Sequence, residues 1–182
     1  MGQYFRSVTK QDGIITVYNG DVNNRYTMAK LMEHSWWEND LLKAIGNKFY
    51  KKKGQLMWVG DYTDDGELEK LTKNEVTNDY VWGDNKGVGI KKSGFAFDNK
   101  YLCNHTKKLY VNLKTYYDRS LNDDGWCINP LSLLTAVGNG RGGGDYWGIN
   151  KRFVGKWAWD VISIEDTIPE KYKEFPIWFA EK

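Results

Sequence analysis

Residues 4–18, YFRSVTKQDGIITVY, contain two segments that are typical of β-strands, with a turn between them. Residues 4–8 and 14–18 are rich in aromatic and β-branched side chains, which favour strands. The intervening residues 10–13, KQDG, end in Asp-Gly, a pair that favours a tight turn. The sequence therefore predicts a β-hairpin at the start of the chain.

A second hairpin is predicted where residues 100–103 and 109–113 flank a polar turn. Between the two hairpins, residues 55–61, QLMWVGD, form a largely apolar run that predicts a buried strand. An apolar run also follows Pro130 and extends to Val137. Further strands are expected in the last third of the chain, at residues 126–128, 157–164 and, as a final edge strand, 176–179.

The strongest helical signal lies between these strands. Ser35 is followed three residues later by Glu38, which has the form of a capping box. This pair predicts a helix that begins at Ser35, runs to about Lys53 and stops at Gly54. Helical spacing gives the segment one apolar face, made of Leu41, Leu42, Ile45 and Phe49.

Two shorter helices are also expected. Thr27 can cap one that reaches Glu33, and the polar stretch 66–79 can hold another. The chain shows neither an internal repeat nor a linker-like segment. We therefore predict a single domain over residues 1–182, of α+β class, with a mainly antiparallel sheet whose hairpins pack against one or two helices.

The composition narrows the possible functions. The 182 residues include 26 Lys and Arg against 24 Asp and Glu, a net charge of +2. A long nucleic acid usually recruits a clear basic excess, so it is an unlikely partner. No apolar run approaches the ~18 residues of a membrane span, and the first residues lack an apolar targeting segment. We expect a cytoplasmic protein with no membrane partner.

The outstanding feature is the Gly loop, residues 138–144, GNGRGGG, in which five of seven residues are glycine. Such clusters provide positive φ angles or a close approach of the backbone to another group. Successive amide groups could cradle a phosphate, and Arg141 could bind the same anion. Asp145 could hold the loop in place or bind a metal. The alternative is a plain surface loop without a ligand.

Trp147 and Trp157 flank the Gly loop in the sequence. Because the chain has 28 aromatic residues (9 Trp, 12 Tyr and 7 Phe), stacking of a base on one of these rings is an attractive hypothesis, although most rings fill cores. The predicted ligand-binding residues are Gly138, Asn139, Gly140, Arg141, Gly142, Gly143, Gly144, Asp145, Trp147 and Trp157.

Catalytic signatures are weak. Asp61, Asp145 and Asp160 could serve a two-metal hydrolase if the fold brought them together. His34 is expected to be a hydrogen-bonded residue between two helices rather than a general base, and His105 a solvated residue in a hairpin turn. Cys103 and Cys127 have no zinc-ligand spacing and are expected to be buried and reduced. We predict no catalytic residue, metal or cofactor.

Several segments resemble a family of small proteins encoded by phages and prophages. They include the MGQY start, KLMEHSWW at 30–37, GNGRGGGDY at 138–146 and VGKWAWDVIS at 154–163. The resemblance implies a phage-type origin and a place in the host-cell cytoplasm. It also implies, by analogy, an accessory factor that blunts a host defence. No residue role is carried over from this family.

Three functional hypotheses follow. In the first, the chain antagonises a host defence system by capturing a phosphate-bearing small molecule, such as a nucleotide signal, with the Gly loop. In the second, it inhibits a host defence protein, for example a CRISPR nuclease, by direct protein–protein binding. In the third, it is a metal-dependent hydrolase of nucleotides or nucleic acid.

Overall fold

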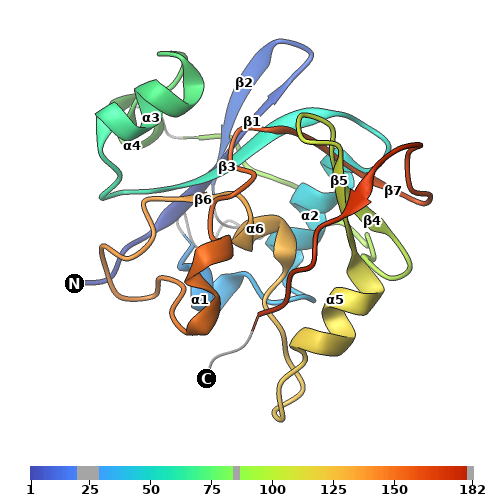
Figure 1. Ribbon diagram of the computed structural model, residues 1–182. Helices are drawn as coiled ribbons and strands as arrows, with labels where there is room; N and C mark the ends of the chain where they lie inside the picture. Colours follow the sequence, from blue (N-terminus) through green and yellow to red (C-terminus); the bar gives the residue numbers. More distant parts are fainter. Residues whose placement is uncertain (20–28, 84–86, 180–182) are drawn as a thin grey trace.

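The computed structural model describes residues 1–19, 29–83 and 87–179. These residues form one α+β domain with a mostly antiparallel sheet (Figure 1). The strand order in the sheet is β2-β1-β3-β7-β4-β5-β8, and β6 pairs with β3. The strands are β1 (Phe5–Gln11), β2 (Ile14–Tyr18), β3 (Gly54–Gly60), β4 (Tyr101–Asn104), β5 (Leu109–Asn112), β6 (Ala136–Val137), β7 (Val161–Glu165) and β8 (Lys173–Glu174). The helices are α1 (Leu31–His34), α2 (Asp40–Phe49), α3 (Asp65–Thr72), α4 (Asn78–Trp82), α5 (Leu113–Ser120), α6 (Pro130–Leu133) and the 3₁₀ helix η1 (Ile149–Phe153).

Both predicted hairpins are confirmed. Strands β1 and β2 pair antiparallel, and Asp12 and Gly13 turn between them with φ angles of 52° and 80°. Strands β4 and β5 pair in the same way, with Cys103 opposite Tyr110. The predicted buried strand becomes β3, which lies between β1 and β7 at the centre of the sheet. Turn chemistry and strand propensity were sufficient for the two hairpins because their paired strands are close in the sequence.

Helix α2 presents the predicted apolar face to the core, but both predicted ends are wrong, since the helix ends at Phe49 rather than near Lys53 and begins at Asp40 rather than at Ser35. The N-cap is Asn39, whose Oδ1 accepts a hydrogen bond from the Leu41 backbone N–H at 2.9 Å. Ser35 instead ends α1, and its buried hydroxyl donates to the Leu31 carbonyl. Ser35, which the capping-box pattern predicted to begin a helix, therefore ends the preceding helix α1. Thr27, the predicted cap of that helix, lies outside the described residues.

The sheet buries side chains on both faces. Along β3, Leu56 and Trp58 belong to the larger core, which also includes the apolar face of α2. Met57 and Val59 point to the opposite face and form a second core with residues of α3 and α4, among them Leu68. Alternate residues of a strand point to opposite faces, so a strand buried on both sides needs apolar residues throughout. In Figure 1, α3 and α4 lie together beside the β1–β3 region, away from α5.

Three other strand predictions need correction. Residues 126–128 contribute one isolated bridge, from Ile128 to Trp36, rather than a strand. Residues 157–160 form turns, and β7 begins only at Val161, because Trp159 has a φ of 61° that interrupts extended backbone. Residues 176–179 are not a strand. The chain instead pairs with β5 through β8, just before Pro176, which has no N–H to donate.

Candidate functional site

The backbone N–H groups of the Gly loop already bind a carboxylate of the chain itself. The Oδ2 atom of Asp145 accepts hydrogen bonds from the backbone nitrogens of Gly140 at 2.5 Å, Arg141 at 2.8 Å and Gly142 at 3.1 Å. The Asp145 residue is only 6% exposed. This carboxylate takes the place that a phosphate was expected to take, so the loop is not an open cradle.

The loop is also closed at its base by a pair of side chain–backbone hydrogen bonds. Asn139 Oδ1 accepts from the Tyr146 N–H at 2.7 Å, and Asn139 Nδ2 donates to the Tyr146 carbonyl at 3.1 Å. The hydroxyl of Tyr146 is buried and lies within hydrogen-bonding distance of Ser35 Oγ at 2.7 Å and Ser132 Oγ at 2.9 Å. These contacts anchor the loop to α1 and α6, so Asn139 and Asp145 are structural residues of the loop.

Packing against the first residues of the chain explains several of the glycines. The Gln3 N–H donates to the Gly143 carbonyl at 2.8 Å, and the Gly143 N–H donates to the Met1 carbonyl at 3.0 Å. A Cβ on Gly142 would lie 2.6 Å from Gln3 Cβ, and a Cβ on Gly144 would lie 2.8 Å from Lys30 Cδ. The close approach that the glycines permit is therefore to other parts of the chain.

Arg141 extends from the loop towards α3. Its Nη1 donates to the Tyr62 carbonyl at 2.7 Å, and its Nη2 pairs with Glu67 Oε2 at 2.5 Å. The guanidinium is partly exposed, at 37% for the side chain. The Gly loop thus places a cation at the edge of α3 rather than at its own centre.

The two tryptophans that flank the Gly loop differ in burial. Trp157 is 1% exposed and lies in the larger core, where it packs against Phe175 at a ring distance of 5.4 Å. It cannot offer a stacking face to a ligand, so its predicted binding role is wrong. Trp147 is 51% exposed and presents its ring to solvent.

The carboxylates do not assemble into a metal centre. Asp61 accepts a hydrogen bond from the Tyr4 N–H, and burial raises its pKa, with a smaller contribution from the Asp145 charge. Asp160 pairs instead with Lys107 and accepts from Asn104. Within residues 1–19, 29–83 and 87–179, no group of three or more His, Cys, Asp or Glu side chains could hold a metal ion.

The two histidines and the two cysteines differ in their burial and in their hydrogen-bond partners. His34 accepts a hydrogen bond from the Lys30 N–H through Nδ1, consistent with its expected role between helices. His105 is half-buried rather than solvated, and its ring nitrogens lie 2.7 Å from Ser163 Oγ and from the Tyr172 hydroxyl. Cys103 and Cys127 are buried free thiols, and burial raises the pKa of each to about 12.

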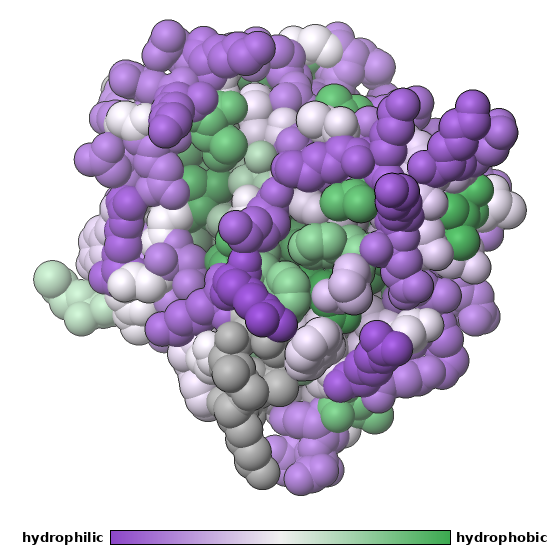
Figure 2. Space-filling model, viewed as in Figure 1, coloured by the Kyte–Doolittle hydropathy of each residue, from purple (hydrophilic) through white to green (hydrophobic). Residues whose placement is uncertain are grey.

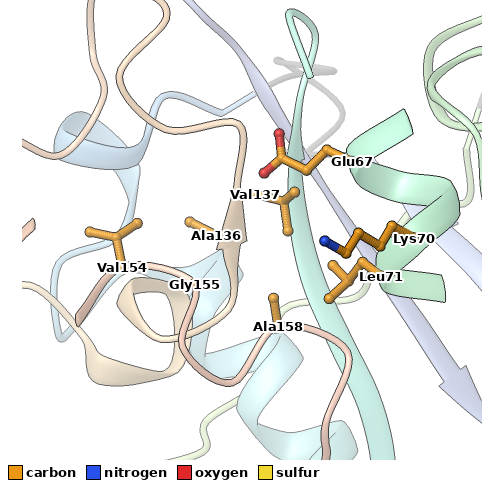
Figure 3. A pocket seen from close by; sticks show the side chains of 8 residues that line it. All are labelled: Glu67, Lys70, Leu71, Ala136, Val137, Val154, Gly155 and Ala158. Carbon is orange, nitrogen blue, oxygen red and sulfur yellow. The ribbon is translucent and has the colours of Figure 1, made fainter. Parts of the chain in front are cut away.

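A groove with a volume of about 450 Å³ lies between α3, β6 and the turn that follows η1 (Figure 3). We call it the α3 groove. Its walls are mainly small or apolar, and its charged residues both come from α3. The lining residues are Glu67, Lys70, Leu71, Ala136, Val137, Val154, Gly155 and Ala158.

The Lys70 ammonium points into the α3 groove, while the Glu67 carboxylate lies at the groove edge and pairs with Arg141 (Figure 3). No ion pair found among the described residues includes Lys70. Figure 2 shows hydrophobic side chains gathered beside α3, with hydrophilic side chains around them. The Gly loop borders this groove because β6, which supplies Ala136 and Val137, leads directly into Gly138.

The α3 groove is not predictable from the sequence. Its walls come from three separate segments, around residues 67–71, 136–137 and 154–158. The only signal in the sequence was that the otherwise polar stretch 66–79 contains Leu68 and Leu71, which mark an apolar face on an exposed helix. Of the predicted site residues, Arg141 is the one that reaches the groove edge, through Glu67.

No family model, curated protein or solved structure matches the chain. Nor does any helix in the described part of the chain have the length and apolar character needed to cross a membrane. Its function must be inferred from the geometry of the site.

Proposed function

We propose that this chain is a binding protein that captures a small phosphate-bearing molecule in the α3 groove. The observation that carries the proposal is the placement of Lys70, whose ammonium points into an apolar groove of about 450 Å³. Ligand pockets commonly measure about 300–1,000 Å³ and combine apolar walls with a few polar groups that orient the ligand. The groove has this composition.

The charges at the groove favour an anion. Glu67 is the only acidic residue in the lining of the α3 groove, and Arg141 neutralises it. Lys70, an exposed side chain, then supplies a net positive charge next to apolar walls. The apolar part of a ligand would lie against Val137, Val154 and Ala158. A nucleotide, with a flat base and a phosphate, has both of the required parts.

This proposal changes the role of the Gly loop. The loop does not hold the phosphate, because Asp145 already accepts its amide hydrogen bonds. It positions Arg141 so that Glu67 is paired and does not repel an anion. The resemblance to phage-encoded proteins suggests a use for such capture, which is the sequestration of a host nucleotide signal in antagonism of a defence system.

A thermal-shift screen of the purified chain against mononucleotides, dinucleotides and ADP-ribose tests the proposal. A ligand at 100 times its Kd adds about 2.7 kcal/mol to the free energy of unfolding, which is readily measured. We expect Lys70→Ala to weaken binding about tenfold. Ala is the best helix former, so the variant should fold normally.

The matched control is Lys91→Ala, because Lys91 is exposed and does not line the groove. We expect Lys91→Ala to bind as the unmodified chain does. The proposal fails if no compound in the panel raises the melting temperature, or if both lysine variants lose binding to the same extent.

Direct binding to a host defence protein is the second candidate function. It is favoured by a separate hollow of about 320 Å³ lined by Met32, Trp36 and Trp126, in which Trp36 is 39% exposed. Tryptophan is enriched among the residues that dominate protein–protein binding energy. A complex with a defence nuclease that is lost in Trp36→Ala but kept in Lys70→Ala would favour this function over nucleotide capture.

A further inference from the structure

A second hollow, of about 470 Å³, lies at the carboxyl end of α3. One wall is made by Leu71, Thr72 and Lys73, and the opposite wall includes Trp159 and Val161. Leu71 lines both this hollow and the α3 groove, and the neighbouring residues Ala158 and Trp159 line one each. The two spaces therefore meet at Leu71 and border the same two segments of the chain.

Each of the two spaces contains one lysine for which no ion pair is found in the described part of the chain. Lys70 points into the α3 groove, and Lys73 lines the second hollow. The other cation that lines the second hollow, Lys10, is paired with Glu75. Asp160, which also lines it, is paired with Lys107. The carboxylates of Glu75 and Asp160 are thus each paired with a lysine, and the charge of Lys73 can attract an anion.

The position of Lys73 follows from the end of the helix. It is the C-cap residue of α3, in the left-handed conformation with φ 55° and ψ 45°, and its N–H donates to the Glu69 carbonyl. Lys70 lies three residues earlier, in the last turn. A single short segment therefore provides one cation to each of the two spaces that Leu71 lines.

We infer that the ligand of the proposed binding function carries two separated anionic groups, one near Lys70 and one near Lys73, joined by a body that crosses Leu71. This inference rests on the proposed function and narrows its ligand class. A dinucleotide fits this description, because its phosphates are separated by a nucleoside. A mononucleotide or a nucleoside triphosphate does not, since its charge is gathered at one end.

Isothermal titration with three adenine compounds distinguishes these classes. AMP carries one phosphate, ATP carries a clustered triphosphate, and the linear dinucleotide pApA carries two separated phosphates. We expect pApA to bind at least tenfold more tightly than either AMP or ATP. Simple charge attraction would instead make ATP the tightest ligand, which would overturn the inference.

Variants of Lys70 and Lys73 test which lysine binds which anionic group. Lys70→Ala should weaken both AMP and pApA about tenfold, whereas Lys73→Asn should weaken pApA about tenfold and leave AMP within twofold. Asn tolerates the left-handed conformation, so Lys73→Asn removes the charge with little strain. Lys73→Arg keeps the charge and should retain the binding of pApA, which separates loss of charge from damage to the helix end. Lys91→Ala is again the control.

The outcomes separate this inference from the proposed function. Equal affinities for AMP and pApA, or an equal loss of both in Lys73→Asn, would overturn the inference while the capture of a phosphate-bearing ligand stands. Failure of all three compounds to bind would overturn the inference, and it would overturn the proposed function as well if no compound of the thermal-shift panel binds. Tight pApA binding that depends on both lysines would support both.

Discussion

The Asp145 carboxylate and the Arg141 backbone nitrogen are 2.8 Å apart, in the middle of the loop that was expected to bind an external anion. Asp145 accepts the loop hydrogen bonds in the folded chain, and the Arg141 side chain is directed outwards to Glu67. The same residues that suggested a phosphate cradle thus build a self-contained loop. This relationship moves the candidate site from the loop to the adjacent α3 groove.

Removing the Asp145 carboxylate should destabilise the chain. We expect Asp145→Ala to lower the free energy of unfolding by at least about 3 kcal/mol, because three hydrogen bonds to one charged oxygen are lost and a single bond of this kind contributes about 1.5–3 kcal/mol. Urea denaturation measures the change. Inorganic phosphate at millimolar concentration should then stabilise Asp145→Ala more than the unmodified chain, because the vacated loop can accept an anion. Asp118→Ala, an exposed carboxylate paired with Lys114, is the control and should show no such gain.

The two tryptophans beside the loop should respond differently to truncation. Trp157→Ala should cost about 3–5 kcal/mol because it removes a fully buried ring from the core. Trp147→Ala should change the free energy of unfolding by no more than about 0.5 kcal/mol because its ring is exposed. Chemical denaturation measures both values, and similar effects of the two substitutions would contradict the assigned burial.

Two glycines of the Gly loop distinguish the cost of a steric clash from the cost of a positive φ angle. Gly138 has φ 84°, and a Cβ there would lie 2.1 Å from Thr63 Oγ1. Gly140 has φ 94°, but a Cβ would meet nothing within 4 Å. We expect Gly140→Ala to cost about 1–2 kcal/mol, from the positive φ alone. Gly138→Ala should cost more, and thermal denaturation of the two variants should rank them in this order.

Protonation of His105 should lower the stability of the chain in mild acid. Burial, and then the Lys53 charge, lower the pKa of His105, while Glu165 opposes the shift. A histidine whose pKa is lower in the folded than in the unfolded state contributes stability above about pH 6.5, the unfolded value. That contribution is lost as the pH falls through the folded pKa.

Comparison with His105→Gln isolates this effect, since His34 is present in both proteins. Between pH 7.5 and pH 5, the unmodified chain should lose more free energy of unfolding than the variant does. Urea titrations at the two pH values provide the measurement. Parallel losses in the two proteins would show that His105 titrates alike in the folded and unfolded states.

Much of the fold was predictable because its signals are local. The hairpins around Asp12-Gly13 and residues 104–108 have strands whose partners are only a few residues away. The apolar face of α2 repeats at helical spacing, and β3 is continuously apolar because it is buried on both faces. The start of α2 was not predictable, since Ser35 and Asn39 are both acceptable caps. The local hydrogen bond of Ser35 to Leu31 and its tertiary contact with Tyr146 decided between them.

The sequence by itself determined the α+β class, the hairpins, the central strand and the need for close backbone packing in the Gly loop. These follow from side-chain periodicity, turn preferences and the conformational range of glycine. Only the tertiary structure decided that Asp145 turns into the loop, that Trp157 is covered, and that Lys70 faces Val137 and Ala158 across a groove. Such facts depend on which distant segments pack together, because the burial of a ring and the partner of a charge are set by three-dimensional neighbours.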